Sequence, residues 1–434
     1  MKGISSESSD LTVIPSQDIL EKIANGEPVD YDSVLIRGDL DLGNLSWMLE
    51  QSSDQEPENG ELLPPNHFLV IISAIRITNS RIEGPLEFER AIFAEDLEFN
   101  GTEFMQHVSF AGSHLEGYAS FNEAKFDEYA DFSESRFGEY ADFEGVQFCG
   151  DAHFVDAQFN KDSHFRGASF IGDAYFSGSH FDKYADFSES LFTGYASFRI
   201  SQFAGYAYFS ESKFSGDTSF NGVQFHKDAS FMGTPFCEDA SFSRAQFAGY
   251  ATFMNSKFEE FADFSDVQFA KDAYFTEVKF ESLKLPWSSI KDHIVCDGAT
   301  YLSLVKIYSD LEWFKDADDC YYQYRSKSQD GKSWSDRSKY LDIIADLTCG
   351  YGIRPARTVF LSMGLIFVFA GMFWISGAHA SLNDAIYYSF LAFFSDASGP
   401  GAVGIFKYIF VSERLMGWLL MSLFLVTLGK VMIR

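Results

Sequence analysis

The longest regular pattern in the chain is a phenylalanine that recurs alternately every five and every six residues between residues 88 and 280, with Leu115 as the one substitution. Two residues before each of these positions lies a small residue, such as Ala130 before Phe132. Residues i and i−2 lie on the same side of an extended chain, so each unit directs one small and one large side chain to a shared interior. Units this short must turn a corner each time, and stacked coils then cover one another. The pattern predicts a β-solenoid.

Two apolar segments near the end of the sequence predict membrane-spanning helices. Residues 358–378 contain no charged residue, and residues 415–433 contain only Lys430. At 1.5 Å per residue, each segment can cross the ~30 Å hydrocarbon core of a bilayer. We place the two spans at about 357–377 and 414–433.

Between these spans lies a third apolar segment, residues 382–394, which is too short to cross because its helix would measure about 20 Å. Ser381, with Asp384 three residues later, forms a capping-box pattern that predicts where this helix begins. Residues 395–401 are polar and helix-breaking, and such backbone is tolerated at membrane depth only where it is buried in protein or lines water. The segment therefore predicts a re-entrant pore helix followed by a pore loop. The alternative is a membrane hairpin with an interfacial helix between its spans.

The chain is predicted to be a multidomain protein. Near the start, Ile19, Leu20 and Ile23 share one face of a short amphipathic helix. After the repeat, helical spacing resumes and continues towards the first span. The predicted boundaries are 1–30 for an N-terminal helical cap, 31–287 for the solenoid with a polar insertion at about 49–66, 288–353 for a helical connector, and 354–434 for a pore domain.

Charge is distributed unevenly along the chain. The sequence has 33 Lys and Arg against 63 Asp and Glu, but residues 354–434 contain six basic and three acidic residues. The first 353 residues thus carry a formal charge of −33. Such a body repels nucleic-acid phosphate and anionic lipid head groups, so we expect no direct nucleic-acid binding. The same acidity could mimic nucleic acid.

Written in elevens, the repeat reads YADFSESRFGE, YADFEGVQFCG, DAHFVDAQFNK and onward. It resembles the pentapeptide-repeat family, with Phe at the central position and every second unit lengthened by one residue. The resemblance implies a right-handed quadrilateral β-helix with 22 residues per coil. Two residues before each small residue, Tyr and Asp alternate in blocks of three, which predicts an outward ladder that either binds a partner or forms a solvated stripe. Its members are Tyr118, Tyr129, Tyr140, Asp151, Asp162, Asp173, Tyr184, Tyr195, Tyr206, Asp217, Asp228 and Asp239.

The order of span, short helix, polar loop and span resembles the two-transmembrane ion-channel family that includes potassium channels. Aligned with the TVGYG filter of that family, the loop places Ser395, Asp396, Ala397, Ser398 and Gly399 on the five filter positions. Gly399 matches and Ser395 replaces the threonine, but Asp396 and Ala397 depart from the pattern, so potassium selectivity is not implied. The resemblance implies a homotetramer, because one loop cannot enclose a pore. Asp396 predicts a ring of carboxylates that selects cations.

The second span has one stripe at helical spacing that carries its smallest and most polar groups. We interpret this stripe as the pore lining, and the alternative is that its small residues only let helices approach closely. The residues are Leu415, Leu419, Ser422, Val426 and Gly429.

Other signals concern location and chemistry. The first residues lack the apolar run of a signal peptide, and basic residues flank both spans, which predicts a multi-pass cell-membrane protein with cytosolic N- and C-termini. Five cysteines show no metal-ligand spacing, and the sequence contains no phosphate loop or nucleophile elbow. We expect no enzyme activity, no cofactor and no metal.

Together these signals predict an oligomeric membrane ion channel that conducts cations, with a cytosolic pentapeptide-repeat domain for regulation or assembly. A cytosolic partner for that domain is possible. The alternative function is a membrane-tethered interaction scaffold, or an acidic DNA mimic that modulates a topoisomerase without conduction.

Overall fold

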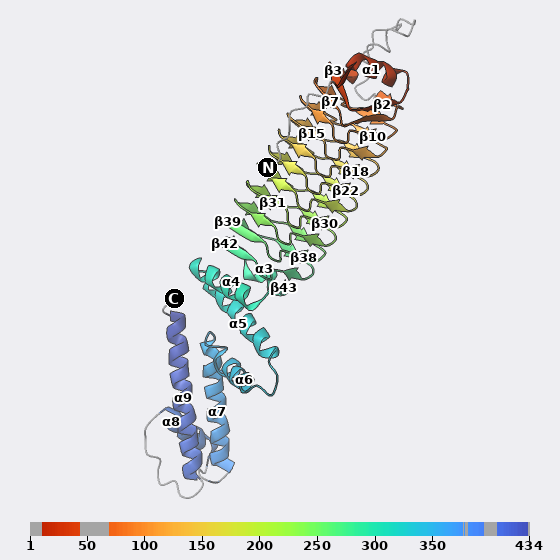
Figure 1. Ribbon diagram of the computed structural model, residues 1–434. Helices are drawn as coiled ribbons and strands as arrows, with labels where there is room; N and C mark the ends of the chain where they lie inside the picture. The colour runs from red at the N-terminus through yellow and green to blue at the C-terminus, as the bar shows by residue number, and fades with distance from the viewer. Residues whose placement is uncertain (1–10, 44–68, 376, 378–380, 395–405, 433–434) are drawn as a thin grey trace, which may run out of the picture. The chain divides into compact units, whose positions relative to one another are not determined.

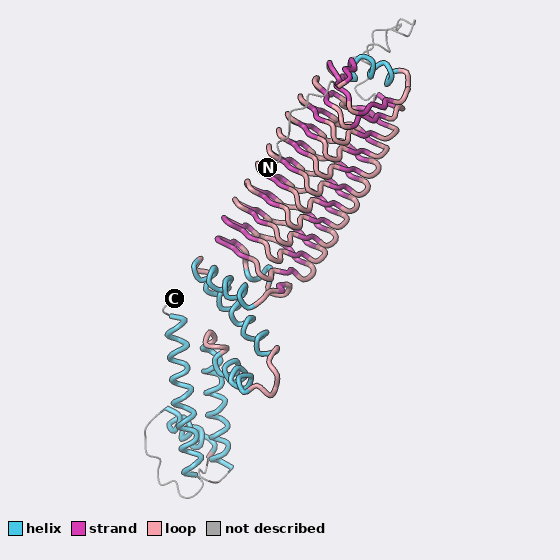
Figure 2. Tube along the Cα trace, viewed as in Figure 1, coloured by secondary structure: helices cyan, strands magenta, loops and turns pink. Residues whose placement is uncertain are grey.

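The computed structural model describes residues 11–43, 69–375, 377, 381–394 and 406–432 (Figure 1). The chain forms two compact units, Met1–Thr300 and Tyr301–Arg434. The first unit is a parallel β-solenoid of about 12 turns, and the second is helical (Figure 2). The predicted solenoid is therefore confirmed.

The solenoid is built from short strands joined by tight corners. From β10 (Leu97–Glu98) to β38 (Ala251–Thr252), every strand has two residues, and strands are longer only towards the two ends. The end strands are β1 (Thr12–Pro15), β2 (Val29–Asp32), β3 (Val34–Arg37), β4 (Leu40–Asp41), β5 (Leu69–Ile71), β6 (Ile75–Thr78), β7 (Arg81–Ile82), β8 (Leu86–Glu87), β9 (Ala91–Phe93), β39 (Lys257–Asp263), β40 (Gln268–Phe269), β41 (Ala273–Tyr274), β42 (Lys279–Lys284) and β43 (Ile294–Val295).

The register of the ladder confirms a coil of 22 residues. Ala130 pairs with Ala152, and Ala152 pairs with Ala174, in parallel throughout. β1 and β3 also pair at 22 residues, but the next step is larger: a hydrogen bond joins Val34 to Ser80 across 46 residues. The extra residues belong to the chain between β4 and β5. The polar insertion expected at about 49–66 lies in this stretch, outside the described residues.

The interior of the solenoid is a set of stacked phenylalanine rings. Phe187 is fully buried, with its ring stacked 4.7 Å from that of Phe165 and 5.0 Å from that of Phe209. Phe176 and Phe198 meet it edge to face. Stacked and edge-to-face pairs are the favoured aromatic geometries, and each ring makes them with the coils on both sides.

The small positions line the same interior. Where they are alanine, as at Ala130, the side chain is fully buried. Where they are serine, the hydroxyl donates to backbone carbonyls: Ser201 Oγ lies 2.7 Å from the oxygens of both Phe176 and Phe198. Each buried hydroxyl of this kind has a partner, which avoids the cost of an unsatisfied polar group.

One corner of the repeat requires a left-handed backbone. From Asn79 to Glu277, every eleventh residue has a positive φ, with values from 48° at Asn79 to 73° at Gly178. Glycine adopts this region freely, whereas other residues are strained there. Ile200, with φ 53°, is the most strained of the set because its side chain is β-branched.

The amino-terminal end differs from the helical cap that we expected for residues 1–30. Helix α1 (Ser16–Ala24) is present and buries Ile19, Leu20 and Ile23. Before it, however, β1 already forms the first rung by pairing with β3. The sequence of β1, Thr-Val-Ile-Pro, is rich in β-branched residues, which favour a strand.

The remaining elements are helices. Helix α3 (Trp287–Ile290) lies in the first unit, and α4 (Gly298–Asp310) spans the boundary. The second unit continues with α5 (Phe314–Asp330), α6 (Arg337–Cys349), α7 (Pro355–Ile375), α8 (Leu382–Phe394) and α9 (Phe406–Met432). Helices α7 and α9 are long and apolar enough to cross a membrane. Helix α8 has the bounds predicted for the pore helix. The second predicted span starts at about residue 414 and lies in α9, a helix that begins earlier and includes Lys407 and Glu413.

Candidate functional site

Helices α7, α8 and α9 pack together around α8, the short helix. Phe369, Ala370 and Phe373 of α7 pack with Ala385 of α8 in one cluster. Ile366, Phe393 and Leu420 join all three helices in another. Gly417 of α9 lies so close to α8 that a Cβ there would come within 2.6 Å of the Phe393 carbonyl oxygen. The three helices therefore form one packed unit in which α8 packs against both longer helices.

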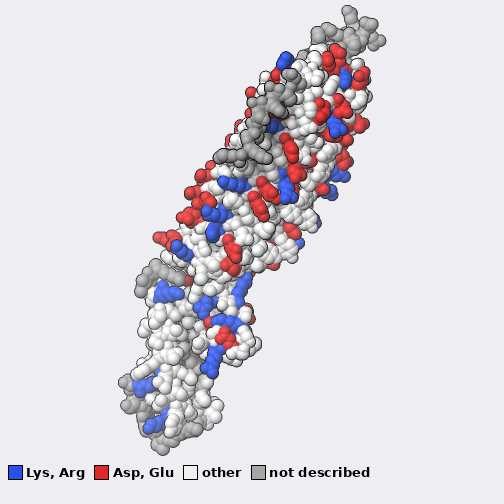
Figure 3. All heavy atoms as spheres, in the orientation of Figure 1, with Lys and Arg blue, Asp and Glu red and all other residues white. Residues whose placement is uncertain are grey.

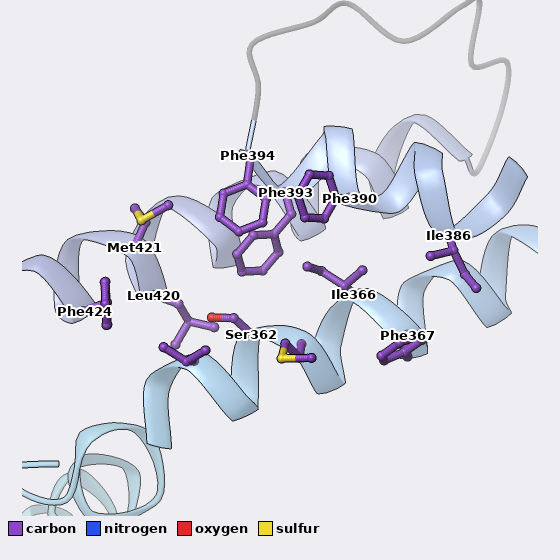
Figure 4. A pocket seen from close by; sticks show the side chains of 12 residues that line it. Ser362, Ile366, Phe367, Ile386, Phe390, Phe393, Phe394, Leu420, Met421 and Phe424 are labelled. Carbon is purple, nitrogen blue, oxygen red and sulfur yellow. The ribbon is translucent and has the colours of Figure 1, made fainter. Parts of the chain in front are cut away.

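A cavity of about 330 Å³ lies among these helices (Figure 4). Ser362 is the one polar side chain that lines it, and the others are aliphatic, aromatic or thioether groups. An apolar cavity of this kind gives no compensation to a bare ion. Its remaining lining residues are Val359, Met363, Ile366, Phe367, Ile386, Phe390, Phe393, Phe394, Leu420, Met421 and Phe424.

A buried polar contact also joins the three helices. Glu413 of α9 and Ser389 of α8 are both fully buried. Ser389 Oγ lies 2.8 Å from the carbonyl oxygen of Ile366 in α7, and it also makes a hydrogen bond with Glu413 Oε1. The other carboxyl oxygen of Glu413, Oε2, has no hydrogen-bond partner among the described residues. This pair was not predicted from the sequence, although a single Glu beside an apolar segment was a visible signal.

The structure tests the predicted pore residues only in part. The five filter positions, Ser395, Asp396, Ala397, Ser398 and Gly399, lie outside the described residues. The stripe on α9 is described, and it faces away from α7 and α8.

Most side chains of this stripe are exposed to solvent in the single chain. The side chain of Leu419 is 63 % exposed and that of Val426 is 70 % exposed. Ser422 is also exposed, and its hydroxyl donates to the Leu419 carbonyl oxygen of its own helix at 2.8 Å. A Cβ on Gly429 would meet no atom within 4 Å, so this glycine serves no close approach within the chain. That the stripe lines a pore stays a prediction.

Helices α5 and α6 of the connector make polar and ring contacts with residues at the start of α7. Arg357 Nη1 donates to Asp346 Oδ1 of α6 at 2.6 Å, and Tyr322 Oη of α5 donates to the same carboxylate at 2.9 Å. The guanidinium of Arg354 lies 3.9 Å from the centre of the Tyr322 ring. At the end of α9, Lys430 Nζ lies 5.5 Å from the centre of the Tyr321 ring. Helix α5 therefore contacts the ends of both long apolar helices.

A second set of ion pairs joins α5 to α6. Asp342 is buried, with Lys332 Nζ 2.5 Å from Oδ2 and Arg325 Nη2 2.7 Å from Oδ1. The hydrogen bond from Lys332, followed by that from Arg325, holds the pKa of the Asp342 carboxyl below its usual range. Nearby, burial raises the pKa of the Tyr351 phenol to about 12. The connector is thus a charged and hydrogen-bonded scaffold, unlike the helices that follow it.

The Asp ladder of the solenoid has a structural role. The carboxylates accept hydrogen bonds from backbone N–H groups 22 residues further along, so each one caps the next coil: Asp162 accepts from Tyr184, and Asp173 accepts from Tyr195. This favours the solvated stripe over a partner-binding ladder. The same bond is made by Asp151, Asp217, Asp228 and Asp239.

Acidic side chains are scattered over the visible face of the solenoid, among basic and uncharged ones (Figure 3). Within the described ranges, no group of three or more His, Cys, Asp or Glu side chains is placed to hold a metal ion.

Comparison with known proteins identifies the repeat. Overlapping stretches of the chain match the family described as pentapeptide repeats (9 copies), at residues 77–125, 110–158, 121–168, 154–199 and 201–246. This part of the chain is a solenoid of pentapeptide repeats. The match does not extend to α7, α8 and α9. No curated protein and no solved structure matches the chain.

Proposed function

We propose that this protein is an oligomeric membrane ion channel that conducts cations, with its pentapeptide-repeat solenoid in the cytosol for regulation or assembly. The observation that carries the proposal is the arrangement of α7, α8 and α9. A helix of 13 residues, too short to cross a bilayer, packs against two helices that are long enough. It is followed in the sequence by the polar segment 395–401. A half-helix and a polar loop between two spans are the parts from which a pore can be built.

A single copy offers only one such loop, so several copies must surround a pore. The resemblance to two-transmembrane channels implies four. The exposed stripe of Leu419, Ser422, Val426 and Gly429 supports this assembly, because it faces away from the rest of its own chain. In a tetramer this stripe would line the pore. The protein would lie in the cell membrane with both termini in the cytosol, and it would have no enzyme activity.

Cation preference would come from the loop and from α8. The carboxyl end of a helix carries about half a negative charge. Asp396 follows that end closely in the sequence and would add one carboxylate from each copy.

The test is ion flux through the purified full-length protein in liposomes. We expect flux with a cation-selective reversal potential in asymmetric salt, and Asp396→Asn should weaken that selectivity. Asp384→Asn is the matched control: it removes a carboxylate from the other end of α8, where Asp384 bonds Ser381. Equal reversal potentials for wild type and Asp396→Asn would contradict the filter assignment. Absence of flux would contradict the channel.

The solenoid would act on the pore through the connector. Because α5 contacts both the start of α7 and the end of α9, a force on α5 would reach both helices together. A truncated chain beginning at residue 301 keeps these contacts and removes the solenoid. We expect it to conduct with altered single-channel open probability. Unchanged open probability would make the solenoid a docking platform rather than a gate.

A second function is favoured by one observation, the acidic surface of the solenoid (Figure 3). A membrane-tethered scaffold, or a DNA mimic that modulates a topoisomerase, needs that surface but has no use for a half-helix between two spans. Residues 1–300 added to a DNA supercoiling assay would inhibit the topoisomerase under this alternative. They would have no effect if the protein is only a channel.

A further inference from the structure

If Glu413 is ionised, the contact between Ser389 and Glu413 has one proton for two acceptor oxygens. Ser389 Oγ lies within hydrogen-bond distance of two oxygens, Ile366 O and Glu413 Oε1. A serine hydroxyl has one proton to donate, and a carbonyl oxygen has none. If Glu413 is ionised, that one proton must serve both oxygens, as the proton of Ser201 does between two carbonyl oxygens. A protonated carboxyl group would instead donate to Ser389 and leave the serine proton for Ile366.

We propose that Glu413 is a proton-binding site that fastens α8 to its two neighbours. The carboxylic acid donates to Ser389, and Ser389 donates to the carbonyl of Ile366, so one chain of hydrogen bonds runs from α9 through α8 to α7. The unpartnered Oε2 fits this assignment, because a neutral acid leaves a carbonyl-like oxygen rather than a buried negative charge.

The charged and titratable groups around Glu413 agree with a neutral acid. Helix α7 has no charged residue after its first turn. On α8, Tyr388 is the titratable group that interacts with Glu413, and Asp384 bonds Ser381 at the helix start.

On α9 itself, the guanidinium of Arg414 lies 5.2 Å from the centre of the Trp418 ring. Lys407 lies near the start of the helix and is exposed. No salt bridge to Glu413 is formed among the described residues. Breaking a buried charge pair is costly, and burying a charge that was never paired is costly for the same reason.

Loss of the proton should weaken the hydrogen bonds that join Glu413, Ser389 and Ile366. An ionised Glu413 can only accept, so Ser389 would have to choose between the carboxylate and the Ile366 carbonyl. The buried charge would also draw water towards α8. The proton site itself does not depend on conduction, whereas its effect on channel opening rests on the proposed function.

Infrared difference spectroscopy on the full-length protein in lipid nanodiscs tests the site directly. The difference between wild type and Glu413→Gln at pH 7 should contain the carbonyl stretch of a protonated carboxylic acid. That band should shift in Ser389→Ala, which removes its hydrogen-bond partner, and should remain in the control Asp384→Asn. It should disappear as the pH is raised and the proton passes to water. A difference spectrum at pH 7 that contains only carboxylate bands would overturn the proposal.

Thermal unfolding of the same samples gives an independent readout. Gln can still donate from its amide to Ser389, so Glu413→Gln should fold and should mimic the protonated state. If the folded protein holds a proton that the unfolded chain releases, wild-type stability falls as pH rises, and the variant lacks that fall. Parallel pH dependence of wild type and Glu413→Gln would overturn the proposal. Absence of flux with the infrared band present would reject the channel and still support the proton site.

Discussion

The two units of this protein achieve stability in opposite ways. In the solenoid, the same few features recur along the stack: a stacked Phe, a small buried residue and a left-handed corner, with an Asp cap on some of the coils. In the helical unit, each polar contact occurs once, as with Asp342 between α5 and α6 or Glu413 between α8 and α9. Repetition gives each buried ring several ring neighbours in the same coil and in the adjacent coils, whereas each polar contact of the helical unit depends on a few residues that occur once.

The largest expected effect is in the Phe stack. Phe187→Ala should lower the free energy of unfolding of residues 1–300 by about 3 to 5 kcal/mol, because it leaves a cavity between four neighbouring rings. Denaturant unfolding of the two proteins measures the difference. Tyr184→Ala is the control: that ring is partly exposed, and the change should cost much less. Equal losses for the two substitutions would mean that the rings do not carry the stability of the solenoid.

A smaller effect is expected at the ion pairs of the connector. Asp342→Asn should destabilise the helical unit by about 1 to 3 kcal/mol, because Lys332 and Arg325 lose their charged acceptor. Hydrogen exchange of α6 amides should accelerate in the variant, while the solenoid amides remain unchanged.

The same carboxylate gives a pH dependence that serves as the control. Its pKa is depressed in the folded state, so its contribution is fully present above the unfolded value of about 4. The contribution is lost as pH falls through the folded value. Wild type should therefore approach the α6 exchange rates of Asp342→Asn on acidification. A constant difference down to low pH would show that the pairing is not electrostatic.

The smallest effect concerns one corner of the solenoid. Ile200→Gly should raise the stability of residues 1–300 by about 0.5 to 1 kcal/mol, since the relief of left-handed strain exceeds the entropy lost by glycine. Ile200 is mostly exposed, so little packing is lost with it. Gly222, one coil further on, has the same conformation, and Gly222→Ala should shift the thermal midpoint in the opposite direction. Shifts of the same sign would show that backbone strain is not what distinguishes the two corners.

Prediction from sequence succeeded where a signal was repeated. The Phe period predicted the coil length and the buried face correctly. The period recurs so often that a single departure such as Leu115 does not obscure it. The span predicted at about 414–433 gave no start for α9, which begins at Phe406, because the charged residues Lys407 and Glu413 interrupt the apolar pattern of its first turns. The strand β1 was missed because it stands alone before a helix, without a repeat to identify it.

The contact between Ser389 and Glu413 was not predicted for a related reason. Whether Ser389 and Glu413 meet depends on how three helices pack, and nothing in the spacing of either residue encodes that contact. The filter assignment of Ser395 to Gly399 stays a prediction, because those residues lie outside the described part of the chain.

The register of 22 residues means that the length of the solenoid is set in equal steps of one coil. In the central part of the stack every coil pairs with the next in the same alignment, and Asp side chains cap several of the coils. Removing one whole coil would shorten the stack by a step of about 4.8 Å and would leave every remaining rung with a neighbour of the right shape. Removing eleven residues would leave half a turn, so that side chains meant for one wall would meet the opposite one. The length of this domain can therefore change in evolution only by whole coils.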